Sequence, residues 1–360
     1  MTLLFHISQW FIQISFLIVV LVFLLRPIII KLFDRYGYLR SIALVILAAM
    51  LWLRPFVSPC VGSSGGADAP LHRWLSQLLL PGEPTAAALG FILLLAEAFY
   101  LNFILIRINV IPKKSLLPAA FYILLMSQSV QGLTLNPVLC GAAFVLPALD
   151  LIFRSRDGRN LTVNIFSTAI LFALASLFCF EFLFFFPLLF VSLIVYKNTL
   201  PLRMSMVAIA GFAAVFLLLF LFYFLVGGVA EQMGVYAKRV LYPPLFWQEL
   251  EMAQYILIGW QVSIYYMAIS TVIANRDKLN DYTRKTMFLS ISFLLLSLVS
   301  VLYMLDKLEL ALMLPAIPST IFMGAYISLT TNKKMMGFLE MMLLTSCLVL
   351  FFYNLWWVEC

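Results

Sequence analysis

Residues 160–197 read NLTVNIFSTAILFALASLFCFEFLFFFPLLFVSLIVYK, and this stretch decides the fold of the chain. Between its flanking cations, Arg159 and Lys197, it carries one charged residue, Glu181. Because about 20 apolar residues cross the hydrocarbon core of a bilayer, the stretch is long enough for two spans. It predicts a transmembrane helical hairpin with a tight turn at residues 180–182, its base on the cytoplasmic side and Glu181 near water at the tip.

The composition extends this interpretation to the whole chain. Of its 360 residues, 64% are hydrophobic and 11% are charged, and the mean hydropathy is +1.06. No soluble domain buries that much apolar surface, so we expect an all-α polytopic membrane protein, a single integral membrane domain over residues 1–360. We attribute the net charge of +7 to cytoplasmic loops and expect no nucleic-acid partner.

Apolar runs predict a bundle of about 12 spans: residues 9–30, 41–57, 85–106, 116–130, 136–153, the two halves of 160–197, 206–226, 252–274, 287–305, 310–330 and 338–358. When these spans alternate in direction, all but five of the 23 Lys and Arg residues fall in cytoplasmic loops. The five on the other side are Arg54, Arg73, Lys238, Arg239 and Lys307. We therefore expect a multi-pass protein of the cell inner membrane, with both termini on the non-cytoplasmic side.

Two long loops, residues 58–84 and 227–251, lie outside the cytoplasm in this topology, and we expect short interfacial helices in them. The first contains PLHRWLSQLLL at residues 70–80. Apolar positions recur there at helical spacing and polar positions take the other face: Leu71, Trp74, Leu75, Leu78 and Leu79 against His72, Arg73 and Gln77. The segment is too short to span, so it predicts an amphipathic helix on the membrane surface.

These outer loops also gather polar residues at the lipid interface, and loops of this length are often functional. A carboxylate beside cations and aromatic rings could hold a phosphate-linked lipid, with Arg or Lys on the phosphate and Asp as a base. The candidates are Asp68 as the base, Arg73, Lys238 and Arg239 as phosphate ligands, and His72, Gln128 and Glu181 as further polar groups. The alternative is that all of them are ordinary polar loop residues.

Acidic residues inside spans are the other place to look for function. Glu97 lies mid-span in LLLAEAFYLN, and we interpret it either as a proton or ion ligand or as an acid that fixes helix packing. Asp150 lies four residues before Arg154, the spacing of an ion pair on a helix surface.

The chain carries no catalytic or cofactor motif. It lacks a Walker A sequence, a GxGxxG after a strand, HExxH and GxSxG. Its two histidines, His6 and His72, cannot build a multi-histidine metal site, and its five cysteines have no paired spacing. We expect no metal and no cofactor.

Three segments within residues 93–228 carry a resemblance: LLLAEAFYLNFILIRINVIPKKSLLPAAFYILLM, NIFSTAILFALASLFCFEFLFFFPLLFVSLIVYK and IAGFAAVFLLLFLFYFLVGG. Together they resemble an uncharacterised family of multispanning inner-membrane proteins from Bacteroidetes. More loosely, the layout resembles that of C-type glycosyltransferases, with many spans, an amphipathic helix in a large first outer loop and a tight central hairpin. This resemblance implies a glycosyltransferase-like fold, a polyprenyl-phosphate-linked sugar donor and a catalytic acid in that first loop, the position of Asp68.

The leading hypothesis is an inner-membrane protein of envelope biogenesis that binds or transfers a lipid-linked sugar, with membrane lipids and a polyprenyl-phosphate-linked glycan as partners. A transporter or lipid-glycan flippase is the first alternative, but such proteins show midplane ion ligands, broken helices and repeats. Here Glu97 is the one acid clearly near mid-membrane, and no repeat is evident. A non-catalytic scaffold with a membrane-protein partner is the third hypothesis.

Overall fold

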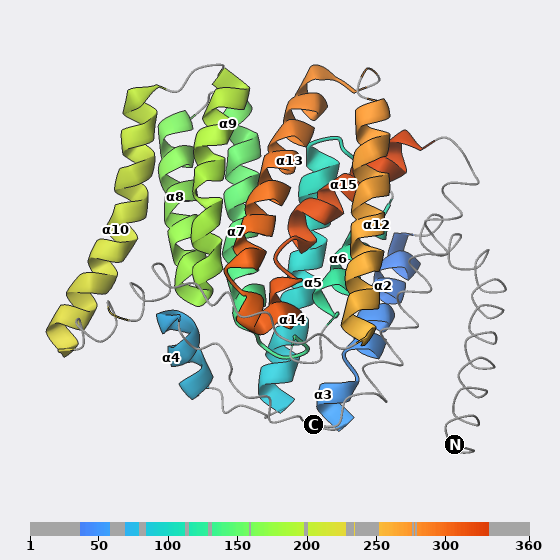
Figure 1. The fold of residues 1–360 in the computed structure, drawn as a ribbon, viewed down its shortest axis with the longest axis horizontal. Coiled ribbons are helices and arrows are strands. Elements are labelled where there is room, and N and C mark those ends of the chain that lie inside the picture. Colours follow the sequence, from blue (N-terminus) through green and yellow to red (C-terminus); the bar gives the residue numbers. More distant parts are fainter. Residues whose placement is uncertain are drawn as a thin grey trace.

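Helices form every regular element in the part of the chain that the structure describes (Figure 1). This computed structural model describes residues 37–57, 69–78, 84–111, 115–128, 132–157, 160–197, 201–227, 252–275 and 279–330, with the single positions 234 and 277. Two of the predicted spans, residues 9–30 and 338–358, lie outside these ranges.

The order of elements follows the predicted spans closely. The α-helices are α2 (Gly37–Leu51), α3 (Arg54–Val57), α4 (Pro70–Leu78), α5 (Pro84–Arg107), α6 (Leu117–Met126), α7 (Pro137–Arg154), α8 (Leu161–Phe178), α9 (Pro187–Lys197), α10 (Leu202–Val226), α12 (Met252–Ala274), α13 (Asp281–Leu302), α14 (Leu308–Ala311) and α15 (Ala316–Leu329). In the described ranges, three 3-10 helices join them: η1 (Ser155–Asp157), η2 (Phe180–Phe185) and η4 (Leu305–Lys307).

Seven helical segments among the described residues are long and apolar enough to cross a membrane: Pro84–Arg107, Pro137–Arg154, Leu161–Phe178, Phe180–Lys197, Leu202–Val226, Asp281–Leu302 and Leu308–Leu329. Shorter apolar helices cover Arg40–Leu51, Leu117–Met126 and Gln261–Ala274. The described chain therefore has the helices of a multi-pass membrane protein. The count of 12 spans stays a prediction, because three of the predicted spans are covered by the shorter helices and two lie outside the described residues.

The predicted hairpin forms from α8, η2 and α9, but its tip differs from the expectation. The turn is a six-residue 3-10 helix, η2, rather than a three-residue turn. Glu181 within it is only 3% exposed, so the expectation that it lies near water at the tip is wrong. The reason is tertiary packing, because η2 lies against α13 and the Ser300 hydroxyl donates to the Glu181 carbonyl oxygen at 3.0 Å.

Small residues allow the hairpin to pack closely against its neighbours on both sides. Gly141 of α7 faces the Phe182 ring, and a Cβ built there would overlap that ring. Gly211 of α10 faces α8, where an added Cβ would lie 2.8 Å from the Phe166 carbonyl oxygen. In membranes, where lipid is as apolar as the side chains, such close backbone contact is a main source of helix association.

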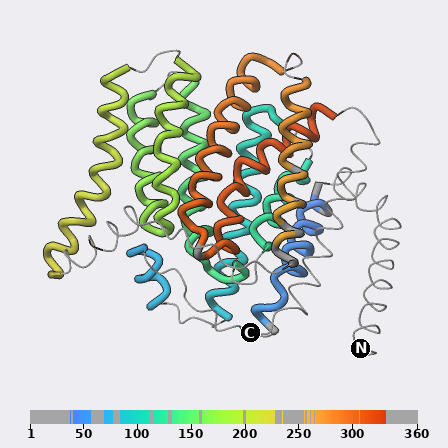
Figure 2. The backbone as a smooth tube through the Cα atoms, viewed as in Figure 1, coloured from blue at the N-terminus to red at the C-terminus, as the bar shows by residue number. Residues whose placement is uncertain are grey.

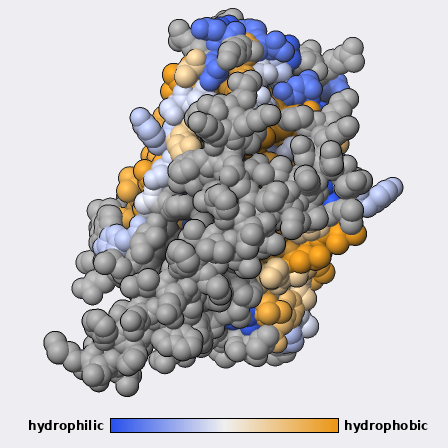
Figure 3. Space-filling model, turned by 90° about the vertical axis from the view of Figure 1, so that its right-hand side faces the viewer, coloured by the Kyte–Doolittle hydropathy of each residue, from blue (hydrophilic) through white to orange (hydrophobic). Residues whose placement is uncertain are grey.

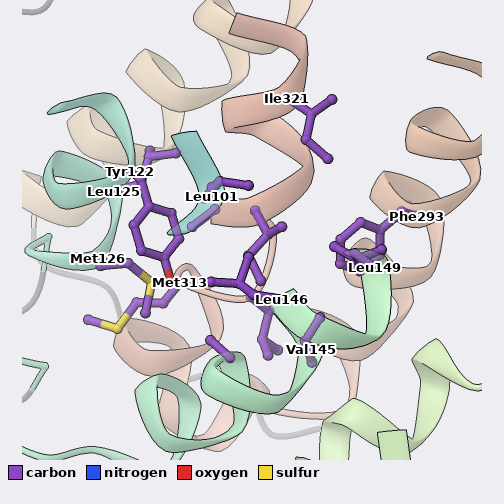
Figure 4. Close-up of a cluster of buried hydrophobic side chains, with 14 of the residues drawn as sticks. Leu101, Tyr122, Leu125, Met126, Val145, Leu146, Leu149, Phe293, Met313 and Ile321 are labelled. Atoms are coloured by element: carbon purple, nitrogen blue, oxygen red, sulfur yellow. The ribbon is translucent and has the colours of Figure 1, made fainter. Parts of the chain in front are cut away.

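The core of the bundle surrounds α15, which is almost entirely buried, whereas α10 lies at one edge and exposes most of its apolar residues (Figure 1). Figure 4 shows buried side chains from different helices in this core. The side chains that meet there include Leu101 of α5, Tyr122 of α6, Leu146 of α7, Phe293 of α13 and Ile321 of α15, all buried.

The alternating helices give the bundle two distinct ends (Figure 2). At one, α5, α7 and α9 finish and α8, α10 and α13 begin; we call it the basic end, and it holds Arg107, Arg154, Arg156, Lys197, Arg203, Arg284 and Lys285. Hydrophilic side chains gather there, at the top of Figure 3. The opposite end, which we call the α4 end, holds α3, α4, η2 and α14 with Arg54, Arg73 and Lys307.

Candidate functional site

The first candidate site is the α4 end, where α4 forms the predicted amphipathic helix. Leu71 packs against the cluster formed by Ala173 and Leu177 of α8 and Val215 of α10, so the helix is docked on the bundle rather than separate from it. Trp74 is 62% exposed. The helix therefore presents an aromatic side chain to its surroundings while its first turn is held by protein.

His72 corrects the expected arrangement of the two faces of this helix. It was assigned to an outward polar face, yet it is only 7% exposed. Its imidazole interacts with the backbone of Leu135, just before α7, and lies within electrostatic range of Lys307. Burial lowers the pKa of His72 below its ordinary value of 6.5, the positive charge of Lys307 lowers it further, and the Leu135 hydrogen bond acts in the opposite direction. The His72 imidazole therefore joins α4 to the rest of this end.

Arg73 has different neighbours from His72. It is partly buried, and Tyr223 of α10 lies within its electrostatic range. Lys307 approaches α4 from η4, as its effect on His72 shows. The structure thus places two cations and one exposed aromatic ring, Arg73, Lys307 and Trp74, around one short helix. The distribution of Lys and Arg in the loops had placed Lys307 on the non-cytoplasmic side, with no functional role predicted for it.

Three of the predicted site residues, Asp68, Lys238 and Arg239, lie outside the described residues. The candidate base and two of the three candidate phosphate ligands therefore remain sequence predictions. In the sequence, Asp68 comes two residues before Pro70, the first residue of α4.

Glu181, a further polar candidate, is held inside the hairpin turn. Its carboxylate oxygen Oε2 accepts a hydrogen bond from the Cys179 thiol at 3.0 Å. Its backbone carbonyl accepts the Ser300 bond described above. These contacts hold η2 against the preceding Cys179 and against α13. Glu181 is therefore part of the packed fold rather than of an open surface.

Glu97 lies within α5 and is only 3% exposed. The Tyr122 hydroxyl of α6 donates to its Oε2 at 2.7 Å, and its other oxygen, Oε1, has no hydrogen-bond partner among the described residues. No described basic side chain forms an ion pair with it, and the Cys140 thiol of α7 lies within electrostatic range. Of the two interpretations left open for Glu97, this contact favours the acid that fixes helix packing.

Gln128 follows α6 and is also buried. Its neighbour Ser127 accepts a hydrogen bond from the Trp52 indole at 3.0 Å and donates to the Ile123 carbonyl at 2.7 Å. The Gln128 amide oxygen has no partner among the described residues. This polar junction fixes the end of α6 against α2, and nothing in it joins Gln128 to α4.

A second charged cluster lies at the basic end, around Asp150. The predicted pair is confirmed, with Arg154 Nη2 2.8 Å from Asp150 Oδ2. Arg107 of α5 completes the cluster, since its Nη1 donates to Asp150 Oδ2 at 3.0 Å and its Nη2 contacts Oδ1. Sequence spacing could not indicate this partner, because Arg107 lies 43 residues away.

Within the described ranges, no group of three or more His, Cys, Asp or Glu side chains could hold a metal ion. Comparisons with protein-family models, with curated proteins and with solved structures found no match for this chain.

Proposed function

We propose that this chain is an inner-membrane protein of envelope biogenesis that binds a lipid-linked sugar at its α4 end, with that end facing away from the cytoplasm. The observation that carries the proposal is the docking of α4: a helix too short to span is fixed on α8 and α10, with Trp74 exposed and Arg73 and Lys307 beside it.

The chemistry of such a ligand suits these side chains. A polyprenyl phosphate joins an apolar chain to a phosphate at the level of the membrane interface. Guanidinium and ammonium groups pair with phosphate, and an exposed indole favours the interface, where its apolar ring meets lipid. A helix fixed by protein contacts holds these groups in place before the ligand arrives, which reduces the entropy cost of binding.

If the bound sugar is transferred, Asp68 is the candidate base. An acceptor hydroxyl would lose its proton to the Asp68 carboxylate while its oxygen forms a bond to the anomeric carbon of the sugar. The bond from that carbon to the phosphate oxygen breaks, and the polyprenyl phosphate leaves with the electron pair. Arg73, Lys238 or Arg239 would stabilise the negative charge on the departing phosphate. The role of catalytic acid in the first outer loop is the one that the resemblance to C-type glycosyltransferases implies for Asp68.

The transporter hypothesis has weaker support. Its best candidate ligand, Glu97, is enclosed by packed side chains and bound to Tyr122. A scaffold function is what remains if the α4 end binds no lipid phosphate.

The test uses the purified full-length chain in nanodiscs of phosphatidylcholine. Binding of a short polyprenyl phosphate is compared with that of the corresponding uncharged polyprenol by native mass spectrometry. We expect retention of the phosphate form only, and about tenfold weaker binding for Arg73→Gln, the loss of one charged hydrogen bond. Arg203→Gln, at the other end, is the matched control and should bind as the wild type does. Equal retention of phosphate and alcohol would overturn the proposal.

Catalysis is tested separately with a polyprenyl-phosphate sugar carrying a labelled sugar. Asp68→Asn should keep the binding preference and abolish transfer of the label. Binding without transfer in the wild type would leave the protein a lipid-glycan binder rather than an enzyme.

A further inference from the structure

The short helix α4 is attached to the bundle mainly through one face. Its apolar contact is Leu71, which packs against the cluster shared by α8 and α10. Its polar contact is the hydrogen bond between the His72 imidazole and the backbone of Leu135. Trp74 and Gln77 of the same helix are exposed. A nine-residue helix held in this way can separate from a protein at a lower free-energy cost than global unfolding requires.

The backbone that His72 contacts is fixed independently of α4. Leu135 lies in the segment before α7, and the side chain of the next residue, Asn136, donates to the Gly132 carbonyl at 2.8 Å. The same segment lies against α5, because a Cβ built on Gly90 would be 3.0 Å from the Leu135 nitrogen. The Leu135 backbone therefore stays in place whether or not α4 is docked.

Three features of the docked position oppose a positive charge on His72. The residue is only 7% exposed, so an imidazolium there would lose most of its hydration. An imidazolium donates through both ring nitrogens, and Nδ1 has no hydrogen-bond partner among the described residues. Lys307 lies within electrostatic range and would repel the added charge. Protonation of the docked ring would therefore leave a buried charged donor without a described acceptor, beside another cation.

The elements around α4 do not offset this cost. Helix α8, against which α4 packs, carries no charged residue. The segment before α7 offers its backbone to His72, and η4 contributes the cation Lys307. The other charged or titratable side chains described at this end are Arg54 of α3, Arg73 of α4, Cys179 and Glu181 at the hairpin turn, Tyr223 of α10, Tyr303 after α13 and Glu309 of α14. Burial, the Leu135 bond and Lys307 are the influences that act on the ionisation of His72.

We propose that α4 is an acid-sensitive switch, docked on the bundle while His72 is neutral and released from it when His72 takes up a proton. In the released state the ring is hydrated and away from Lys307, so it has the ordinary pKa of 6.5. In the docked state burial and Lys307 hold the pKa of His72 below that value. Docking is therefore most favourable above about pH 6.5 and weakens as the pH falls toward the docked-state pKa.

Release changes what the α4 end presents to its surroundings. It separates Arg73 on α4 from Lys307 on η4, so acid divides the two cations of this end. In the proposed orientation, the pH that acts on His72 is the pH outside the cytoplasm. The switch itself does not depend on the sugar-lipid proposal, because its contacts are those of α4 with its own protein.

The test measures the distance between α4 and α8 by double electron–electron resonance, on the full-length chain in phosphatidylcholine nanodiscs at pH 7.5 and pH 5. Spin labels are placed on a pair of cysteines at the exposed positions 77 and 163 of a cysteine-free chain. We expect one docked distance at pH 7.5 and a second, broader population at pH 5. With a released-state pKa of 6.5, the ratio of released to docked molecules should rise between about threefold and about 30-fold.

Three variants make the result specific. His72→Gln, whose side chain takes up no proton, should change the ratio less than twofold between the two pH values, whereas His6→Gln should respond as the wild type does. Leu71→Ala weakens docking without touching the imidazole, so it should raise the released fraction at both pH values and keep the pH response. It also brings both states into measurable range where the wild type stays almost fully docked.

A direct titration keeps the proposal falsifiable where His72→Gln itself releases α4. His6→Gln leaves His72 as the one histidine of the chain, so NMR of isotope-labelled histidine follows its protonation alone. Protonation and release should share one midpoint, below pH 6.5. Protonation of His72 with α4 still docked would overturn the proposal. So would a ratio that changes less than twofold between pH 7.5 and pH 5 in both the wild type and Leu71→Ala.

Discussion

Arg107 and Asp150 join two membrane-spanning helices by a charged pair, with Arg107 Nη1 donating to Asp150 Oδ2 at 3.0 Å. The Asp150 side chain is 4% exposed, whereas those of Arg107 and Arg154 are 29% and 54% exposed. The carboxylate is thus buried beneath two cations that keep contact with the surroundings. A buried carboxylate must be compensated by a cation close to it, and Arg107 is the less exposed of the two partners. The stability of the fold should therefore depend more on Arg107 than on Arg154.

Replacing Arg107 should therefore cost more than replacing Arg154. We expect Arg107→Met to lower the free energy of unfolding by about 2–3 kcal/mol, because it leaves the buried Asp150 with one partner from its own helix. Arg154→Met should cost less than about 1 kcal/mol, as for exposed ion pairs. Unfolding by SDS in mixed micelles measures both. Equal losses of unfolding free energy in the two variants would contradict a larger contribution from the ion pair that joins α5 to α7.

The Glu97–Tyr122 contact gives a second prediction. Tyr122→Phe removes the one hydrogen-bond donor that Glu97 has among the described residues and should destabilise by about 1–3 kcal/mol. Glu97→Gln keeps an acceptor for the Tyr122 hydroxyl and should be tolerated better. A double-mutant cycle in the same unfolding assay should give a coupling energy of about 1 kcal/mol. Additive effects would contradict a packing role for Glu97.

Close contact between α7 and η2 gives a third prediction. Gly141→Ala places a methyl group where the Phe182 ring lies and should destabilise by about 1–3 kcal/mol. Phe182→Leu in the same chain should recover part of this loss by removing the ring. The control is Gly259→Ala on α12, where an added Cβ meets no described atom within 4 Å, so the change should be neutral or stabilising by up to about 1 kcal/mol. Similar losses at both glycines would refute the contact.

The fourth prediction concerns pH and His72. Its folded-state pKa lies below that of the unfolded chain, so the unfolded state binds more protons as the pH falls below about 6.5. The contribution of His72 to stability is therefore present above that pH and is lost as the pH falls toward the folded-state pKa, with a slope of at most about 1.4 kcal/mol per pH unit. His72→Gln should remove this slope from thermal unfolding between pH 5 and pH 8. The other histidine change, His6→Gln, should preserve it.

The sequence predicted the helices well and the contacts between them poorly, for a physical reason. A continuous apolar run of span length fixes a helix locally, so α5, α7 and α10 begin and end close to the expected residues. The Asp150–Arg154 pair is equally local, because both residues lie on one helix. These features need no knowledge of the neighbouring helices.

The errors arise where a distant segment decides the environment of a residue. Glu181 was expected near water, but it is buried by packing against α13, whose Ser300 lies 119 residues away. His72 was placed on an outward face because the periodicity of α4 separates apolar from polar residues without showing that protein covers the polar side. Tyr122, the partner of Glu97, carried no signal in spacing or composition.

The proposed sugar-lipid site rests on one premise, that the α4 end and the basic end face opposite sides of the membrane, with the basic end in the cytoplasm. Single cysteines at position 157 of η1 and position 77 of α4, in a cysteine-free chain, test it directly with a membrane-impermeant maleimide on intact cells. We predict that position 77 is labelled in intact cells and that position 157 is labelled only after permeabilisation. Labelling of position 157 in intact cells, with position 77 protected, would contradict the orientation and with it the proposed outward-facing site at α4.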